Sequence, residues 1–381
     1  MLALLQRTFA QAPCLGPAPG QVPDSLTVPG SLTVVVPAYN EAANIGDCVA
    51  AILASEPPCS TWRLLVVDDA STDQTAALAE AALAAGSVAS ALLPAGPRPQ
   101  GERWVGKNWA CYQANRWLDQ AGGSDWLLFL DADVRLEPGA LRLALADASR
   151  HGADLLSLAP RLSCSCLAEW LVQPLIASLL GLGFPIQRAN DPADSLAFAA
   201  GPFMLFRRSS YLAVGGHGAV AAEVVEDLAL ARAIKGRGLR LRYLLALDQI
   251  TLQMYPNFQA LWEGWSKNWF LGLDRDVIKA LGAGGLVVQL FAVPWLLLPV
   301  GLLLAVVQRP PLAWAPLAVS LVGIALQLAI RLWSRHRFRL PLDWWWLAWA
   351  GALVIGAIAP VSVVKTLTGR GWTWRGRSLQ A

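Results

Sequence analysis

An α/β fold with a mostly parallel sheet is predicted for residues 31–275, and membrane helices are predicted for residues 276–381. In the first segment, short runs rich in branched and aromatic residues alternate with Ala- and Leu-rich stretches of helical spacing. In the second, long windows lack Asp, Glu, Lys and Arg. The whole chain is 55% apolar and only 15% charged, which is typical of a membrane protein.

Strands and helices are expected to alternate along the first segment. Ala/Leu-rich helical stretches at 41–54 and 73–85 separate the apolar runs. This alternation predicts βαβ units, whose strands pair in parallel. The expected strands are LTVVV (32–36), WRLLVV (62–67), WLLFL (126–130) and ADLLSL (153–158).

Residues 1–30 are expected to be a leader that precedes the folded domain. The apolar core of MLALLQRTF is too short for a secretory signal, and residues 11–30 are rich in Pro and Gly. The six cysteines are scattered without a CxxC pair, and only three histidines are present, so a zinc site is not expected. Scattered cysteines indicate a reducing compartment. The net charge of +3 does not imply a nucleic-acid partner.

Three hydrophobic segments are expected to cross the membrane. They lie at 285–307, 312–330 and 344–364, inside windows that carry no charged residue. Trp344, Trp345 and Trp346 stand at the edge of the last segment, as aromatic residues do at a bilayer surface. The alternative is a set of buried core helices, but three such windows in succession favour the membrane.

Three predicted strands end in polar clusters. Pro37-Ala38-Tyr39-Asn40-Glu41, Asp68-Asp69-Ala70-Ser71-Thr72-Asp73 and Asp131-Ala132-Asp133 follow the runs that end at 36, 67 and 130. Each cluster alone is consistent with turn chemistry or a helix cap. Together they favour one site, because ligands of such sheets bind beyond the carboxyl ends of the strands. Carboxylates there can hold a divalent cation, or accept hydrogen bonds from a base or ribose.

PAYNEAANI, VVDDASTD and FLDADV, in this order and spacing, resemble a family 2 glycosyltransferase with the GT-A nucleotide-sugar fold. The resemblance implies that Asp69 contacts the nucleobase. It also implies that Asp131 and Asp133 form the DxD pair for ribose and for Mg²⁺ or Mn²⁺, with Asp133 the favoured metal ligand. The remaining implied donor contacts are Ala38, Tyr39 and Glu41.

Two downstream segments extend the resemblance. AAGPFMLFRRSSYLAVGGHG (199–218) is similar to the segment that walls the sugar and acceptor pocket in this family. EVVEDLALARAIKGRG (223–238) begins with Glu226 and Asp227, and the second acid of this pair is implied to be the general base. Without the upstream motifs, stabilisation of a helix N-terminus would explain both acids. The pocket residues implied by these segments are Gly201, Pro202, Gly215, Gly216 and Glu226.

ERWVGKNWAC (102–111) and the tail TWRGR (373–377) resemble membrane glycosyltransferases that act on carotenoids, hopanoids or ceramide. Lys107 is implied to face the nucleotide diphosphate, although a solvated surface lysine is the alternative. FQALWEGWSKNWF (258–270) stands where processive relatives carry QxxRW, and its departure from that pattern argues against a polysaccharide synthase. Trp265 and Lys267 of this stretch are expected near the acceptor, with the role of Lys267 open.

The sequence therefore predicts an inverting glycosyltransferase that moves a sugar from a nucleotide sugar to a membrane lipid, with a carotenoid or related isoprenoid favoured. A ceramide-like lipid, diacylglycerol, hopanoid or polyprenyl phosphate is the alternative acceptor, and a catalytically silent membrane scaffold is the alternative class. The catalytic domain is expected in the cytoplasm on a multi-pass chain. Basic clusters at 331–339 and 365–377 flank one segment, however, so three full crossings conflict with the positive-inside rule.

Overall fold

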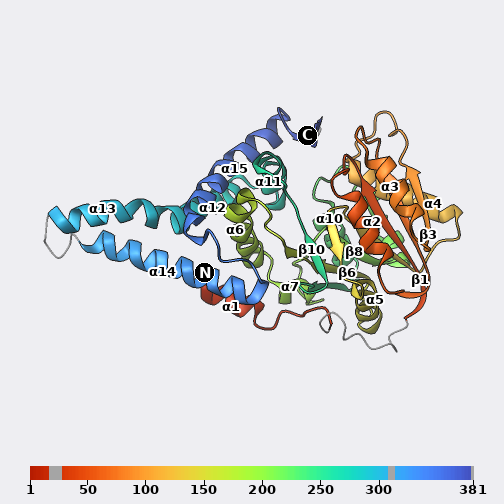
Figure 1. Ribbon diagram of the computed structural model, residues 1–381, viewed down its shortest axis with the longest axis horizontal. Coiled ribbons are helices and arrows are strands. Elements are labelled where there is room, and N and C mark those ends of the chain that lie inside the picture. Colours follow the sequence, from red (N-terminus) through yellow and green to blue (C-terminus); the bar gives the residue numbers. More distant parts are fainter. Residues whose placement is uncertain (17–27, 308–313, 379–381) are drawn as a thin grey trace. The chain divides into compact units, whose positions relative to one another are not determined.

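The computed structural model describes residues 1–16, 28–307 and 314–378 (Figure 1). The chain divides into two compact units. The sheet unit comprises residues 8–161 and 184–252, and the helical unit comprises residues 1–7, 162–183 and 253–381. The helical unit thus takes in residues 162–183 from the middle of the predicted α/β segment, so the division is not a single cut near residue 275.

A seven-stranded sheet forms the centre of the sheet unit, in the order β3-β2-β1-β4-β8-β6-β9. All its strand pairs are parallel except those of β8, which runs antiparallel to β4 and to β6. The mostly parallel sheet is therefore confirmed. Its strands are β1 (Val28–Ala38), β2 (Cys59–Asp68), β3 (Ala89–Pro94), β4 (Trp126–Leu130), β6 (Leu155–Ala159), β8 (Phe203–Arg207) and β9 (Leu241–Leu245).

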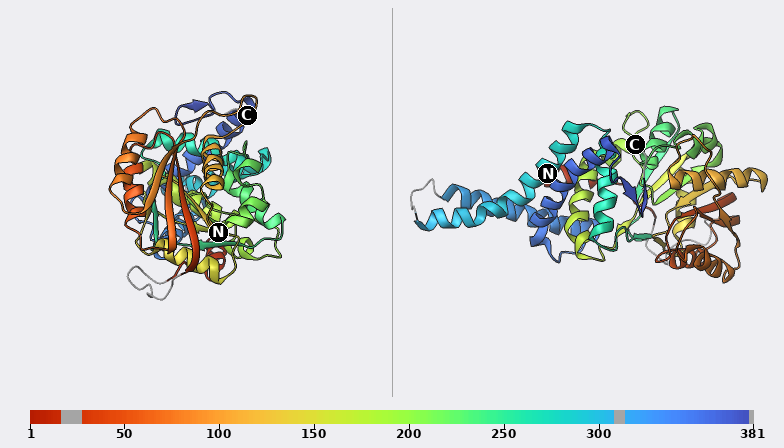
Figure 2. Two further views of the ribbon diagram at one scale, coloured as in Figure 1. Left: turned by 90° about the vertical axis from the view of Figure 1, so that its right-hand side faces the viewer. Right: turned by 90° about the horizontal axis from the view of Figure 1, so that it is seen from above.

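Helices cover both faces of this sheet (Figure 2). The strand residues Val35, Leu65 and Phe129 form a buried core with Trp109 and Leu118 of α4. Residues that alternate with these, such as Val34, are also buried. Burial on both faces explains why the strands appear in the sequence as continuous apolar runs. The helices are α2 (Ile45–Leu53), α3 (Thr75–Ala84), α4 (Gly106–Gln120), α5 (Ala140–Arg150), α7 (Ile186–Asn190), α8 (Arg208–Ala213), α9 (Gly216–Ala219) and α10 (Glu226–Gly236).

The chain around the predicted leader has more structure than expected. β1 begins at Val28, and Leu15 is buried, with its backbone N–H donating to the carbonyl of Leu245 at 2.8 Å. Most of the Pro- and Gly-rich stretch lies outside the described residues. A small second sheet has the order β5-β10-β7, with strands β5 (Val134–Leu136), β7 (Arg161–Leu162) and β10 (Ile250–Leu252).

The helical unit contains three helices long and apolar enough to cross a membrane: 277–307, 315–338 and 345–368. The first is continued through a π-helical turn, and the second runs eight residues beyond the predicted 330 to include Arg331, Arg335 and Arg337. The elements of the helical unit are α1 (Leu2–Phe9, which ends in the sheet unit), α6 (Leu167–Gly183), α11 (Phe258–Gly272), α12 (Val277–Val287), η1 (Val288–Ala292), α13 (Val293–Val307), α14 (Ala315–Phe338), η3 (Trp345–Leu347), α15 (Ala348–Thr368), β11 (Thr373–Trp374) and β12 (Arg377–Ser378).

Candidate active site

The loops after β1 and β2 are joined into one rigid edge. Ala38 and Asp68, the last residues of these strands, are neighbours in the parallel register. The backbone N–H of Asn40 donates to Ser71 Oγ at 3.0 Å, and that of Glu41 donates to Thr75 Oγ1 at 2.7 Å. Ala38 is buried, while Tyr39 and Glu41 are half-buried. The polar residues after the strands therefore hold the two loops together at this edge of the sheet.

Asp69 is buried and paired with a cation. Its carboxylate Oδ2 lies 2.6 Å from Nη2 of Arg98, and its side chain is 3% exposed against 28% for Arg98. Its backbone N–H donates to the carbonyl of Ala38 at 2.8 Å. Arg98 was not predicted. It lies in a Pro- and Gly-rich stretch without periodicity, where no pattern distinguishes Arg98 from the nearby Arg103.

Asp131 and Asp133 lie in the turn between β4 and β5. The backbone N–H of Asp131 donates to the carbonyl of Pro202 at 3.1 Å, which fixes the turn against the start of β8. Ala132 between them is buried. The DxD pair thus occupies the carboxyl end of a central buried strand, as expected.

Lys107, at the start of α4, joins the DxD turn to α10. Its Nζ lies 2.7 Å from Asp131 Oδ1 and 2.6 Å from Glu226 Oε1, and it donates to the carbonyl of Gly201 at 3.4 Å. Burial alone would lower the pKa of Lys107, but the two carboxylates outweigh it and hold that pKa well above its ordinary value. Lys107 is therefore a charged tie between two acids rather than a solvated surface lysine.

Glu226 and Asp227 are adjacent but differ in protonation. Burial raises the pKa of Asp227 to about 7, and the neighbouring charge of Glu226 adds to the rise. For Glu226, burial also acts upward, but the Lys107 ammonium outweighs it and lowers the pKa. Glu226 is thus ionised, while Asp227 titrates near neutrality. Two carboxylates whose environments separate their pKa values are typical of acid–base sites.

Backbone donors hold the Asp227 carboxylate in place. Its Oδ2 accepts from the backbone N–H of Gly201 at 2.9 Å, and its Oδ1 accepts from that of Leu228 at 2.7 Å. A Cβ atom on Gly201 would lie 2.9 Å from Asp227 Oδ2 and 3.4 Å from Lys107 Nζ. Gly201 is therefore needed for the carboxylate to approach this closely, and Pro202 beside it contacts the DxD turn.

The electrostatics of Cys111 connect the base-contact candidate to this cluster. Cys111 is a buried residue of α4, and burial raises the pKa of its thiol well above the ordinary value. After burial, the charges that act on it are those of Lys107, Glu226, Asp131 and Asp69. The sheet unit therefore gathers the predicted base contact, the first DxD acid and the acidic pair around the start of α4.

Gly215, Gly216 and His217 stand at the start of α9, where Gly216 and His217 are buried and Gly215 is exposed. Gly215 has a φ of 82° and Gly216 a φ of 51°, and a Cβ on Gly216 would lie 2.4 Å from the Tyr211 ring. The Tyr211 hydroxyl lies 2.8 Å from His217 Nδ1, and burial lowers the pKa of His217 to about 3. Gly216 thus approaches Tyr211, and the approach of either glycine to a ligand stays a prediction.

Trp265 and Lys267 lie on α11 of the helical unit. Trp265 is buried, and its indole N–H donates to Gln173 Oε1 of α6 at 3.0 Å. This contact gives Trp265 a packing role inside the helical unit. The predicted part of Trp265 and Lys267 in acceptor binding stays a prediction.

The DxD carboxylates fit a divalent cation that takes its other ligands from substrate and water. Hard cations such as Mg²⁺ and Mn²⁺ prefer carboxylate oxygens, and Mg²⁺ is usually held by one or two carboxylates plus phosphates. Within 1–16, 28–307 and 314–378, no group of three or more His, Cys, Asp or Glu side chains forms a complete protein metal site. Asp131 and Asp133 are thus the residues available for a substrate-completed site.

The central residues of this site belong to a region that matches a known family. The family model described as Glycosyl transferase family 2 matches residues 33–215. The match covers just under half of the chain and contains the three motifs, in agreement with the resemblance based on them. Asp227 lies beyond the matched residues.

Curated proteins similar to this chain come from Staphylococcus aureus. Two proteins named 4,4'-diaponeurosporenoate glycosyltransferase are 26% (strain MRSA252) and 27% (strain bovine RF122 / ET3-1) identical to it over 256 residues. The matches cover 66% of this chain and 64% of each relative, so the chain spans just under two thirds of the relatives' length.

One solved structure shows the same fold. The mannosyltransferase PcManGT from Pyrobaculum calidifontis, in complex with GDP-Man and Mn²⁺, superposes with a TM-score of 0.53 at 16% identity. The superposition covers 97% of this chain and 95% of the other. The expected GT-A fold, with apolar helices after the sheet, is therefore confirmed.

Proposed function

We propose that this chain transfers a sugar from a nucleotide-sugar donor to a hydroxyl group of a membrane lipid, a carotenoid or related isoprenoid. The acceptor class rests on the Staphylococcus aureus relatives named as diaponeurosporenoate glycosyltransferases. The donor class rests on the family and on the arrangement of Asp69, Asp131 and Lys107 beyond the strand ends. The catalytic domain lies on the cytoplasmic side, where nucleotide sugars are found.

The observation that carries the reaction is the environment of Asp227. A general base works best when its pKa is close to the operating pH, and burial places this pKa at about 7. Asp227 accepts the proton of the acceptor hydroxyl as its oxygen bonds to the anomeric carbon. The bond from that carbon to the diphosphate breaks, and the nucleoside diphosphate leaves. Attack from the face opposite the diphosphate inverts the anomeric centre.

Three side chains assist the departure of the diphosphate. Asp131 and Asp133 would hold Mg²⁺ or Mn²⁺, which would neutralise charge on the leaving group. Lys107 is charged and already lies against Asp131, so it supplies a further cation at this position. Asp69, held by Arg98, contacts the nucleobase.

Substitution of Asp227 tests the proposal. The protein, reconstituted in lipid nanodiscs, is supplied with labelled UDP- and GDP-sugars and a hydroxylated carotenoid. Asp227→Asn keeps the shape but removes the proton acceptor, so transfer should fall by roughly 10²–10⁴-fold. Donor binding should change little. Glu223→Gln is the matched control, because Glu223 is an exposed acid of the same segment.

A carboxylate acceptor is the second candidate, because the relatives' name begins with that of a carotenoid carboxylate, diaponeurosporenoate. A carboxylate has no proton to lose at neutral pH, so Asp227→Asn would then transfer at near the wild-type rate to the acid but not to an alcohol. Absence of transfer by the wild type with every donor and acceptor would instead support the silent-scaffold alternative.

Metal dependence is tested by chelation. Because carboxylates are the preferred ligands of hard cations and amides bind them poorly, we expect EDTA to abolish transfer and added Mn²⁺ or Mg²⁺ to restore it. The transfer activity of Asp133→Asn should remain low at metal concentrations that saturate the wild type. Full activity in excess chelator would contradict a metal role for the DxD pair.

A further inference from the structure

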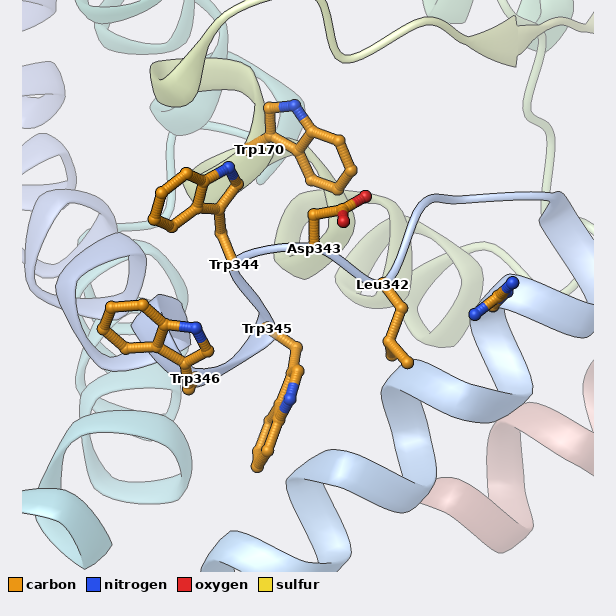
Figure 3. A pocket seen from close by; sticks show the side chains of 7 residues that line it. Trp170, Leu342, Asp343, Trp344, Trp345 and Trp346 are labelled. Atoms are coloured by element: carbon orange, nitrogen blue, oxygen red, sulfur yellow. The ribbon is translucent and has the colours of Figure 1, made fainter.

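A cavity of about 590 Å³ opens within the helical unit (Figure 3). It is formed by the connection between α14 and α15 together with Arg335 of α14 and Trp170 of α6. Its size is in the range of small-molecule sites. The lining residues are Trp170, Arg335, Leu342, Asp343, Trp344, Trp345 and Trp346.

The position of the cavity along the chain points to the bilayer surface. The connection joins 315–338 to 345–368, and each of these helices is long and apolar enough to cross a membrane. A short link between two such helices lies at the level of the lipid headgroups, where tryptophan is enriched. The proposed glycosyl transfer, which is assigned to the sheet unit, does not depend on this cavity.

The connection is fixed in place rather than loosely attached. The Arg331 guanidinium, a buried group of α14, donates to the carbonyl of Pro341 at 3.1 Å. Leu340 is buried as well. Trp344 has a φ of 56°, in the left-handed region that bulky residues rarely adopt. Such conformations persist where the surroundings determine them, and they cluster at ligand sites.

One cation and one anion face the cavity. Arg335 and Asp343 are both exposed, and neither belongs to an ion pair among the residues with defined placement. Figure 3 shows the Asp343 side chain close to the rings of Trp170 and Trp344. The rings of Trp344 and Trp346 have centroids 5.9 Å apart. The cavity therefore combines a guanidinium with a carboxylate that is set among aromatic faces.

We propose that this cavity binds the headgroup of an aminophospholipid. A guanidinium is the preferred partner of a phosphate, so Arg335 takes the lipid phosphodiester. A carboxylate beside aromatic rings suits an ammonium group, so Asp343 takes the lipid amine, and Trp170 and Trp344 flank it. The zwitterionic headgroup matches the one cation and one anion of the site. An anionic lipid without an amine leaves Asp343 unmatched.

Lipid retention tests this assignment. The full chain is reconstituted in nanodiscs of equimolar phosphatidylethanolamine and phosphatidylglycerol, transferred to mild detergent, and examined by native mass spectrometry. The wild type should retain phosphatidylethanolamine over phosphatidylglycerol by roughly tenfold, as expected for one charged hydrogen bond. Equal retention of the two lipids would overturn the proposal.

Two variants separate the roles of the charges. Asp343→Asn should abolish the preference between the lipids while both remain bound, and Arg335→Gln should reduce retention of both roughly tenfold. Arg370→Gln is the control, because Arg370 is an exposed arginine after the other end of α15. Size-exclusion profiles monitor folding. If a variant fails to fold, soluble phosphoethanolamine should displace retained lipid from the wild type, and absence of displacement would count against the site.

Discussion

Lys107 is the residue that gives two adjacent acids different tasks. Its ammonium contacts Glu226 and Asp131 but forms no ion pair with Asp227 among the described residues. Glu226 is thereby kept ionised, and its negative charge, together with burial, keeps the Asp227 pKa high. A base whose proton is lost near neutrality is more reactive at neutral pH than an ordinary aspartate, because its conjugate acid is weaker.

The pH dependence of transfer follows from this arrangement. The proposed general base Asp227 would act in its deprotonated form, so kcat/KM should rise with pH through about 7 and level off above it. Lys107→Met removes the cation that holds Glu226 ionised and should shift this limb, whereas Glu223→Gln should leave it in place. Initial rates from about pH 5.5 to 9 measure the pH dependence of kcat/KM for each variant. A kcat/KM that stays constant across this range would contradict the raised value.

At this scale, the motifs predicted much of the candidate site. The polar clusters after the strands predicted that Asp69 and Asp131 lie at one edge of the sheet, because the carboxyl ends of parallel strands meet there. Asp227 was named from the family resemblance alone. Arg98 could not be predicted, since its pairing with Asp69 depends on the path of a loop without periodicity. Lys107 was placed near the diphosphate, and its contact with Glu226 was not foreseen.

At the scale of elements, the strands were predicted best where both faces are buried. β4 was predicted at 126–130 and occupies those residues, because its five side chains are all buried. β8 was not predicted as a strand, since Phe203–Arg207 is short and lies within the stretch 199–218 that was interpreted as a pocket wall. Its antiparallel pairing is what brings Gly201 and Pro202 to the strand ends.

Close packing between α6 and α15 explains a glycine within a membrane segment. A Cβ atom on Gly351 of α15 would lie 2.0 Å from the backbone oxygen of Leu171 in α6. Small residues at such contacts let helix backbones approach, which is how helices associate in lipid. The contact also explains why residues 167–183 belong to the helical unit.

Gly351→Ala should therefore destabilise the helical unit. The added methyl forces the two backbones apart, and overpacking of this kind costs about 1–3 kcal/mol. Gly282→Ala on α12 is the matched control, since a Cβ there meets nothing within 4 Å. The thermal unfolding midpoint in detergent measures both. A midpoint for Gly351→Ala equal to or above that of the control would contradict the close approach.

At the scale of the whole molecule, the chain combines a GT-A sheet with a helical unit assembled from separate segments. The uncharged windows predicted the three long helices, because uninterrupted apolar length is visible in sequence. The grouping of 162–183 with 253–381 was not visible, since it depends on contacts between distant residues. The arginines at the end of α14 lie within the helix, which places charge in its last turns.

Membrane association is the prediction that belongs to this scale. The exposed apolar side chains of the long helices, among them Leu303, Val306 and Val322, are each about half exposed or more, which is costly in water and favourable in lipid. The chain should therefore pellet with membranes and dissolve only in detergent. It should resist extraction by carbonate or by about 1 M salt. The peripheral alternative, in which basic residues bind anionic lipid, predicts release by salt, because screening shortens the range of charge interactions. Recovery of intact chain in the soluble fraction after carbonate would show that these helices do not span the bilayer.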